Sequence, residues 1–466
     1  MHVENLMEYK EISKSCHSKL YYLIITLLGF CGLSLISSEG YCRIHSAPII
    51  IEAYTIKSAN YHPIANYRLF ATSSEGEALS IPFQIDEINS TGDFVLDRGN
   101  PITKFQGNGI FDGADQLAFM GDDVGEPKPP TIWKFKKPDI LYEIKYVTIK
   151  DKNKSGSVFL GIYTTSIAAI PPLSTKSYVR FNEQTSTVST DKFIYQFDTD
   201  NYLLSKFVSM KKGPSINIPV INSSTFYLKG DLKYFLTFEI NQKDVGSKLE
   251  SYKLGPIRDI FRIHFHYTFL KMKFKLGMFT EVSIYSNAVH LPAILENPLS
   301  TSTLNYGSSF YYGFSLIESP KTYKIESNFP KFVPYTTGSK VLNSFKSDTT
   351  PERYYWLSMS KPDRLMYMEL IVSEKMRSNK NFPSVYSEDI PGTELIKQRT
   401  NDKVEVLGKS PVNLALNVDL YKFAQGMHLM SFKLFFNNNY SDQLLEEFKD
   451  LKHWYFITSK LDSGAY

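Results

Sequence analysis

The residues best suited to chemistry lie on one strand-like segment of this 466-residue chain, IRDIFRIHFHYTFL, residues 257–270. Its period of two places apolar side chains such as Phe261 on one face and polar side chains on the other. The polar face carries Arg258, Arg262, His264 and His266. Guanidinium groups bind carboxylates in bidentate fashion, and imidazoles exchange protons near neutral pH. These four residues are therefore the candidate catalytic residues of a polysaccharide lyase or hydrolase acting on acidic glycans.

Three other interpretations of this polar face stay open. His264 and His266 could supply two imidazoles to zinc, with His290, His428 or a carboxylate as the third ligand. The face could also line a polar groove for a ligand, or it could be a solvated sheet surface. The sequence offers no pair of carboxylates at a spacing diagnostic of glycoside hydrolysis, because the separation that matters is spatial. The prediction therefore favours a protein without catalysis and keeps the enzyme as an alternative.

A second polar cluster lies in NGIFDGADQLAFMGDD, residues 108–123. Calcium is bound by six to eight oxygens, and Asn108, Asp112 and Asp115 could contribute to such a site. The spacing departs from the EF-hand loop, since positions one, three and five of a frame starting at Asn108 are Asn, Ile and Asp. Asp and Gly also initiate turns, with the Asp side chain capping its own backbone. The turn is the favoured interpretation, calcium the alternative, and no other cofactor is expected.

The stretch LNYGSSFYYGFSL, residues 304–316, concentrates aromatic residues around glycines. Tyr306, Tyr311 and Tyr312 could present their rings for stacking on sugars. The favoured alternative is that they belong to strands of an aromatic-rich sheet and pack in its core.

The segments IPFQIDE, residues 81–87, and NGIFDGADQLAFM, residues 108–120, together resemble a signature of uncharacterised exported bacterial β-sandwich proteins. In that signature a Pro-x-Gln-x-Asp strand precedes an Asn-Gly-x-x-Asp-Gly-x-Asp-x-Leu turn. Some of the proteins that carry it are associated with polysaccharide utilisation. The resemblance implies an exported, carbohydrate-associated context, and it implies no reaction. Gln116 stands where many of these proteins have Glu, which weakens any role of that position as a catalytic acid.

Short apolar or alternating runs separated by Gly, Pro, Asn and Ser predict an all-β fold. The proline-bearing segment AAIPPLSTKS, residues 168–177, predicts a domain boundary. A β-sandwich domain is expected over residues 41–170 and a larger antiparallel β-sandwich over residues 178–466. A helix over 442–454 near the C-terminus, with Ser441 as its N-cap, completes the predicted fold.

The N-terminus predicts export. Residues 20–38 are uncharged and largely apolar, so residues 1–40 are expected to be a signal peptide or a membrane anchor. All three cysteines lie within the first 42 residues, which leaves the rest of the chain without disulfides or thiol chemistry. A membrane contact is expected only through this segment if it is not cleaved.

Composition narrows the function further. The near balance of 52 basic and 48 acidic residues lacks the focused positive charge of nucleic-acid binding proteins. No phosphate-binding loop, Gly-x-Ser-x-Gly elbow or His-Glu-x-x-His motif is present. We therefore expect a periplasmic or cell-surface protein that binds polysaccharide or an envelope protein. The alternatives are the polysaccharide lyase or hydrolase and a structural component of an envelope assembly.

Overall fold

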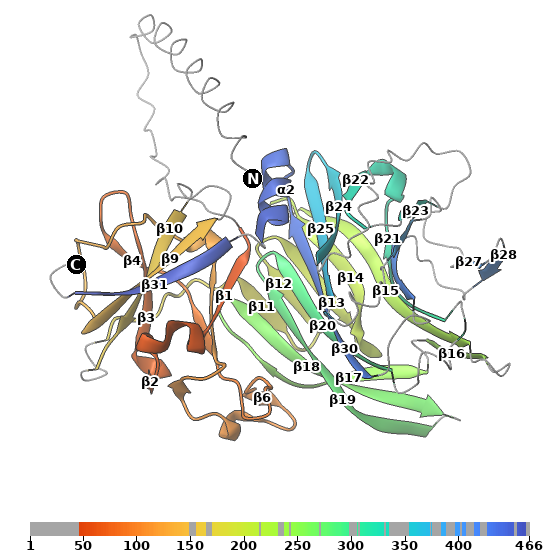
Figure 1. Cartoon of the computed structure of the whole chain (residues 1–466), viewed down its shortest axis with the longest axis horizontal. Helices are drawn as coiled ribbons and strands as arrows, with labels where there is room; N and C mark the ends of the chain where they lie inside the picture. The colour runs from red at the N-terminus through yellow and green to blue at the C-terminus, as the bar shows by residue number, and fades with distance from the viewer. Residues whose placement is uncertain are drawn as a thin grey trace, which may run out of the picture. The chain divides into compact units, whose positions relative to one another are not determined.

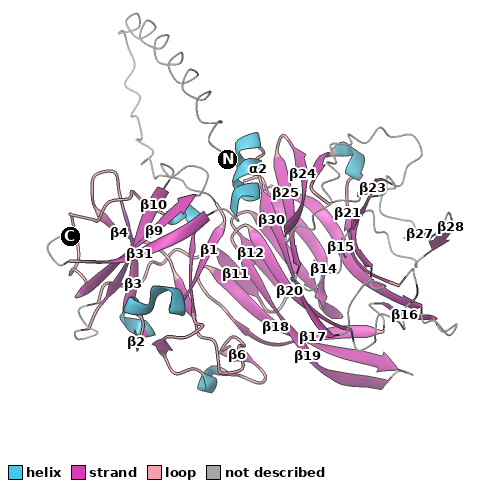
Figure 2. Cartoon of the chain, in the orientation of Figure 1, coloured by secondary structure: helices cyan, strands magenta, loops and turns pink. Residues whose placement is uncertain are grey.

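A computed structural model of the chain confirms the β-dominated fold (Figure 2). The structure describes residues 46–148, 155–164, 170–213, 216–231, 237–241, 244–269, 272–297, 305, 308–329, 332–334, 354–372, 374, 384–387, 397–400, 403–406, 414–419, 426–451 and 454–462. The predicted signal peptide or anchor, residues 1–40, lies outside them. No helix in these ranges is long and apolar enough to cross a membrane.

The first part of the chain builds two small sheets that pack on each other around a core of aliphatic and aromatic residues. One sheet has the order β1-β8-β5, and the other has the order β31-β9-β10-β3-β4. A short pair, β2 with β7, lies beside them. These strands are β1 (Pro48–Glu52), β2 (His62–Pro63), β3 (Tyr67–Thr72), β4 (Ala78–Ser80), β5 (Gln84–Asp86), β7 (Ile110–Phe111), β8 (Gln116–Met120), β9 (Ile140–Thr148), β10 (Ser155–Ile162) and β31 (Trp454–Leu461).

The second part is a larger sandwich of two extended sheets (Figure 1). One sheet contains β11 (Val179–Asn182), β12 (Thr187–Thr190), β13 (Phe193–Asp198), β14 (Asn201–Lys211), β15 (Asn217–Asp231), β16 (Thr237–Asn241), β21 (Ser309–Leu316), β29 (Leu414–Asp419), β26 (Ser384–Ser387) and β23 (Phe332–Pro334). The other contains β22 (Lys324–Ser327), β24 (Tyr354–Lys361), β25 (Arg364–Val372), β30 (Gly426–Asn437), β20 (Ala288–Asn297), β19 (Met272–Tyr285), β18 (Arg258–Phe269), β17 (Val245–Lys253) and β6 (Arg98–Gly99). The pairing is antiparallel as expected, except that β23 and β26 run parallel. A separate two-stranded sheet pairs β27 (Lys397–Thr400) with β28 (Lys403–Val406).

Alternation along the strands explains the sandwich core. On β18, Phe261 and Ile263 are fully buried and pack against residues of the facing sheet. Because successive side chains of a strand point to opposite faces, Arg258 and Arg262 lie on the outer face. The two faces of this segment differ as predicted at Phe261, Ile263, Arg258 and Arg262, while Asp259 on the core face and Ile260 on the outer face depart from the pattern.

Helix α2 (Asp442–Asp450) covers part of the outer face of the nine-stranded sheet. Ser441 caps it as predicted, since its hydroxyl accepts a hydrogen bond from the backbone N–H of Leu444 at 3.0 Å. Phe448 stacks on Tyr367 with 5.5 Å between ring centroids, and Lys449 lies over the Trp356 ring. This packing fixes the helix on the sheet.

Three features join the parts of the chain on either side of residues 168–177. The last strand, β31, pairs with β9 of the first part (Figure 1). The two-residue strand β6 extends the nine-stranded sheet at β17. Residues Tyr41–Tyr466 form one compact unit. The boundary at 168–177 stays a prediction, and strand pairing crosses it in both directions.

Candidate functional site

The two arginines of β18 do not face solvent. Arg258 is 2% exposed and Arg262 is 6% exposed. Segments from the first part of the chain, around Asp86 and Phe94, cover the outer face at this end of the strand. The lyase or hydrolase alternative requires an accessible cationic face here, and burial removes both guanidinium groups from reach of a polymer. The period-two pattern predicted the face correctly, but it contains no information on what covers the face.

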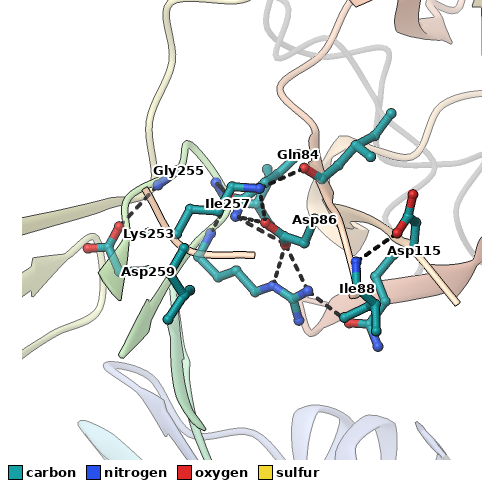
Figure 3. Close-up of polar contacts among 12 residues, drawn as sticks. Gln84, Asp86, Ile88, Asp115, Lys253, Gly255, Ile257 and Asp259 are labelled. Carbon is teal, nitrogen blue, oxygen red and sulfur yellow. Dashed lines mark hydrogen bonds and ion pairs between the residues drawn. The ribbon is translucent and has the colours of Figure 1, made fainter. Parts of the chain in front are cut away.

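Arg258 lies at the centre of a buried polar network. Its Nε donates to Asp86 Oδ2 at 2.8 Å, and its Nη2 donates to Gln116 Oε1 at 2.8 Å. Its Nη1 donates to the Tyr285 hydroxyl at 2.8 Å. Lys253 Nζ lies 2.9 Å from Asp86 Oδ1, so two cations share one carboxylate. Figure 3 shows Asp86 with its carboxylate directed into this network.

Gln84 completes the network from the same strand as Asp86. Its Nε2 donates to Asp86 Oδ1 at 2.8 Å, while its Oε1 accepts from the backbone N–H of Arg258 at 3.1 Å. A Cβ at Gly255 would lie only 1.9 Å from Gln84 Oε1, so only glycine allows this approach. The Gln and Asp of the IPFQIDE segment and Gln116 of the following turn therefore clamp the turn before β18.

The pKa shifts of Asp86 and Arg258 indicate that the two groups form an ion pair. Burial alone would raise the pKa of Asp86, but the charges of Lys253 and Arg258 outweigh burial and lower that pKa below its ordinary value. Burial would lower the pKa of Arg258, but Tyr285 and Asp86 raise it. Both groups are charged at neutral pH, and neither is available as a proton donor or acceptor.

Arg262 is also paired. It donates to Glu281 Oε1 at 2.5 Å and to the backbone carbonyl of Phe94 at 2.8 Å, and it lies 4.7 Å from the centroid of the Phe279 ring. Burial raises the pKa of Glu281, and the charge of Arg262 counteracts this rise only in part. The second arginine therefore also holds a loop of the first part against the nine-stranded sheet.

The histidines are dispersed among different partners. His264 Nδ1 lies 3.4 Å from the carbonyl of Phe265, and the His266 ring packs over Gly246 of β17. His290 Nε2 lies 2.7 Å from Ser431 Oγ, and burial together with the nearby charge of Lys433 lowers the pKa of His290 to about 3. The His428 side chain lies outside the described residues. Among the side chains that are described, no group of three His, Cys, Asp or Glu is placed to hold a metal ion.

The polar side chains of the loop Asn108–Asp115 bond to its own backbone, to each other and to the backbone of Ile88. Asp115 accepts from the N–H groups of Ile88 at 2.7 Å and Asp112 at 3.0 Å. Asn108 Oδ1 accepts from Ile110 N–H at 2.8 Å, and its Nδ2 donates to Asp112 Oδ2 at 3.0 Å. Burial raises the pKa of Asp115 to about 6, although the hydrogen bonds from the two N–H groups act to lower it. Turn chemistry accounts for the residue types, and the calcium site stays a prediction.

The tyrosines predicted to stack on sugars lie in or beside the sandwich core. Tyr311 is 2% exposed. Tyr312 is partly buried and packs edge-on against Phe314 and Phe432, with centroid distances of 5.3 and 5.7 Å. Tyr306 lies outside the described residues. The two described rings have no open face to offer a sugar, in keeping with the core alternative.

Exposed rings occur elsewhere, and three of those in the described part of the chain lie near the loop Asn108–Asp115, at positions that sequence reasoning missed. Tyr54 is 52% exposed, Tyr61 is 73% exposed and Phe105 is 80% exposed. All three flank the loop Asn108–Asp115. Tyr54 N–H donates to Gly113 O and Tyr61 N–H donates to Phe111 O, both at 3.0 Å. We call Tyr54, Tyr61 and Phe105 the ring surface.

Phe105 is linked to the same loop through side chains of the preceding segment. It sits in the short 3-10 turn Lys104–Gln106, which ends directly before the loop. Glu87 Oε1 accepts from Gly109 N–H at 2.6 Å, and Asn89 Nδ2 donates to Gln106 Oε1 at 2.7 Å. These bonds tie the turn that carries Phe105 to the loop.

Comparisons with known proteins give limited similarity. No family model matches the sequence. No curated protein matches it either. Among solved structures, an alpha-mannosidase from Enterococcus faecalis V583 is similar over 91% of this chain and 45% of its own, with a TM-score of 0.40 and 8% identity. A glycosyl hydrolase family 38 protein from Enterococcus faecalis is similar over 91% of this chain and 46% of its own, with a TM-score of 0.37 and 8% identity. The chain thus spans less than half the length of these two proteins.

Proposed function

We propose that this chain is an exported cell-envelope protein that binds carbohydrate through the ring surface of Tyr54, Tyr61 and Phe105. Aromatic rings with one open face stack on the C–H faces of sugars, and neighbouring polar groups form hydrogen bonds with the sugar hydroxyls. On the loop Asn108–Asp115, the exposed carboxamide of Asn108 and the partly exposed carboxylate of Asp112 are groups of this kind, and they also bond to each other.

The observation that carries the proposal is the backbone conformation of Tyr61. Its φ is +68°, in the left-handed region that favours glycine and asparagine. A bulky side chain in this region costs about 1–2 kcal/mol. The Tyr61 ring is 73% exposed, so burial of the ring offsets little of this cost. A strained and exposed tyrosine is best explained by a role of its ring in binding.

The surroundings of Tyr61 hold the ring in place. Its N–H donates to Phe111 O, and the next two residues form β2, which pairs with β7 at His62 and Phe111. Phe111 is fully buried and packs edge-on against Tyr67 at a centroid distance of 5.3 Å. A ring mounted on a fixed backbone loses little conformational entropy when a sugar binds.

Binding without catalysis fits the chemistry better than the lyase or hydrolase. Arg258 and Arg262 are committed to Asp86 and Glu281. Asp115, the buried carboxyl of the loop, accepts backbone hydrogen bonds with both oxygens. Export itself rests on residues 1–40 and on the confinement of cysteine to the first 42 residues.

The proposal is tested with Tyr61→Asn, because asparagine tolerates the left-handed region and lacks the ring. Binding to insoluble and soluble polysaccharides is measured by pull-down and affinity electrophoresis. We expect Tyr61→Asn to lose at least about tenfold in affinity, equivalent to about 1.4 kcal/mol, while its melting temperature is unchanged or higher. The matched control is Tyr455→Asn, an exposed tyrosine on β31.

Two outcomes would overturn the proposal. One is that the wild-type protein binds none of the neutral, cationic and anionic polysaccharides. The other is that Tyr61→Asn and Phe105→Ala both bind as tightly as the wild type, or that Tyr455→Asn weakens binding as much as they do.

A further inference from the structure

Charge is distributed very unevenly along the chain. Residues 46–126, which contain the ring surface, include twelve acidic and four basic residues, a net charge of −8. Residues 127–466 include 32 acidic and 44 basic residues, a net charge of +12. The near balance of the whole chain therefore conceals an acidic segment followed by a basic one.

Part of the acidic excess is neutralised where the segment contacts the sandwich. Asp86 pairs with Arg258 and Lys253, and Asp123 pairs with Lys176 at 3.1 Å. These ion pairs use basic residues from outside the segment. Glu77 likewise pairs with Lys134 at 2.6 Å.

Several of the other carboxylates lie on the segments that carry the ring surface or contact its loop. Glu52 lies next to Tyr54 and raises the pKa of the Tyr54 hydroxyl through a hydrogen bond and its negative charge. Glu87 accepts a hydrogen bond from Gly109 N–H of the loop, and Asp112 is itself a residue of that loop. Asp97 is exposed in the segment that leads to Phe105.

The segments that carry the rings and their loop contain fewer basic residues than acidic ones. Residues 52–61, 87–98 and 104–115 include three basic residues, Lys57, Arg98 and Lys104, against six acidic residues: Glu52, Glu87, Asp93, Asp97, Asp112 and Asp115. At physiological ionic strength a carboxylate influences charges within roughly 8 Å, which is more than the length of one sugar ring. A polymer lying across the rings is therefore exposed to a net negative potential.

We infer, resting on the proposed function, that the ring surface selects glycans with uncharged or amine-bearing sugars and rejects polyuronates. Uncharged sugars stack on the rings without electrostatic cost, and a protonated amino group gains attraction to the surrounding carboxylates. A uronate at the same place meets like charge. This selectivity is opposite to that expected for a cationic Arg and His face.

The experiment compares three soluble polymers in affinity electrophoresis: glycol chitosan, hydroxyethyl cellulose and polygalacturonate. Because residues 127–466 are basic, polyanions can bind elsewhere on the protein, so the quantity scored is the retardation lost in Tyr61→Asn. We expect a Tyr61-dependent retardation for the first two polymers and none for polygalacturonate. The affinity for glycol chitosan should fall at least about threefold between about 20 mM and about 300 mM NaCl, since salt screens the carboxylates.

Glu52→Gln sharpens the test, with Glu75→Gln as the matched control, an exposed acid on the turn between β3 and β4. Glu52→Gln should weaken binding to glycol chitosan at low salt and leave hydroxyethyl cellulose unaffected, while Glu75→Gln changes neither. Tyr61-dependent binding of polygalacturonate would overturn the inference and leave the proposed function standing. Absence of Tyr61-dependent binding to all three polymers would overturn the proposed function itself.

Discussion

Replacing Asp259 with asparagine should stabilise the protein at alkaline pH and have little effect at acidic pH. Asp259 lies on β18 next to Arg258, is 1% exposed and points to the opposite face of the strand. Its Oδ1 accepts from Gly255 N–H at 3.2 Å, and its Oδ2 has no hydrogen-bond partner in the described part of the chain. Burial raises the pKa of Asp259 to about 7, although the Gly255 N–H and the charge of Arg98 act in the opposite direction.

The size of the effect follows from the two pKa values. A shift from an ordinary value of 3.8 to about 7 corresponds to roughly 4 kcal/mol of destabilisation at pH values above 7. The folded protein binds this proton more tightly than the unfolded chain does. The destabilisation is therefore complete above pH 7 and disappears as the pH falls through 7 toward 4.

Asparagine has nearly the same shape and carries no charge, so it removes the alkaline penalty. Its carbonyl oxygen can still accept from Gly255, but its NH2 group adds a buried donor that costs about 1–3 kcal/mol if no partner is found. We expect a net gain of about 1–3 kcal/mol at pH 8.5 and a small loss at pH 5.

The assay is urea unfolding of wild type and Asp259→Asn at pH 5, 7 and 8.5, followed by tryptophan fluorescence and circular dichroism. Asp97→Asn, an exposed carboxyl in the loop before β6, is the control and should show no such pH dependence. The reasoning is refuted if the difference between variant and wild type is the same at pH 5 and pH 8.5, or if the variant is less stable at pH 8.5.

Three further perturbations test other parts of the structure. Asp86→Asn should lower the free energy of unfolding by about 3–5 kcal/mol at pH 7, because it leaves buried cations unpaired; a loss below about 1 kcal/mol in urea unfolding would contradict the clamp. Gly255→Ala should destabilise by about 1–3 kcal/mol, since its Cβ would lie 1.9 Å from Gln84 Oε1, whereas Gly213→Ala, with nothing within 4 Å, should be close to neutral. If the loop Asn108–Asp115 binds calcium, about 1 mM Ca²⁺ should raise the melting temperature and protease resistance, and chelator should reverse both; no change in either would leave the loop a turn held by its own side chains.

Local patterns predicted much of the fold. The alternation of Phe261 and Ile263 with Arg258 and Arg262 identified the strand and both of its faces, because a pleated strand obeys this period wherever it lies. Ser441 identified the start of α2, because capping depends only on neighbouring residues. These predictions succeeded because the residues that interact are close to each other in the sequence.

The candidate sites depend on contacts that are distant in sequence. Asp86 and Arg258 are 172 residues apart. The sequence pattern around either residue does not indicate that the other is its partner. The pattern therefore suggested an open cationic face where the folded chain has a buried ion pair. Only the residue types, an Asp at the end of β5 and an Arg at the start of β18, could have indicated that each needs a partner when buried.

The ring surface was missed because no local pattern in the sequence indicates it. Tyr54 and Tyr61 lie in segments of mixed composition without a period, and exposure of a ring is not encoded by its neighbours in the sequence. Tyr61 adopts a left-handed backbone directly before β2, whose partner β7 is distant in the sequence. Tyr311 was a candidate because aromatic residues are concentrated around it in the sequence, and such a concentration is more typical of a core.

The pairing of β31 with β9 has a consequence for the order in which the chain can fold. Synthesis proceeds from the N-terminus, and the outer edge of β9 stays without its neighbour until residues Trp454–Leu461 have emerged, more than 300 positions later. During translation and any passage through a membrane, the unpaired edge of β9 is a site at which nascent chains can associate. A chaperone that protects this edge, or rapid completion of the chain, would then determine the yield of native protein more than the stability of the finished sheet does.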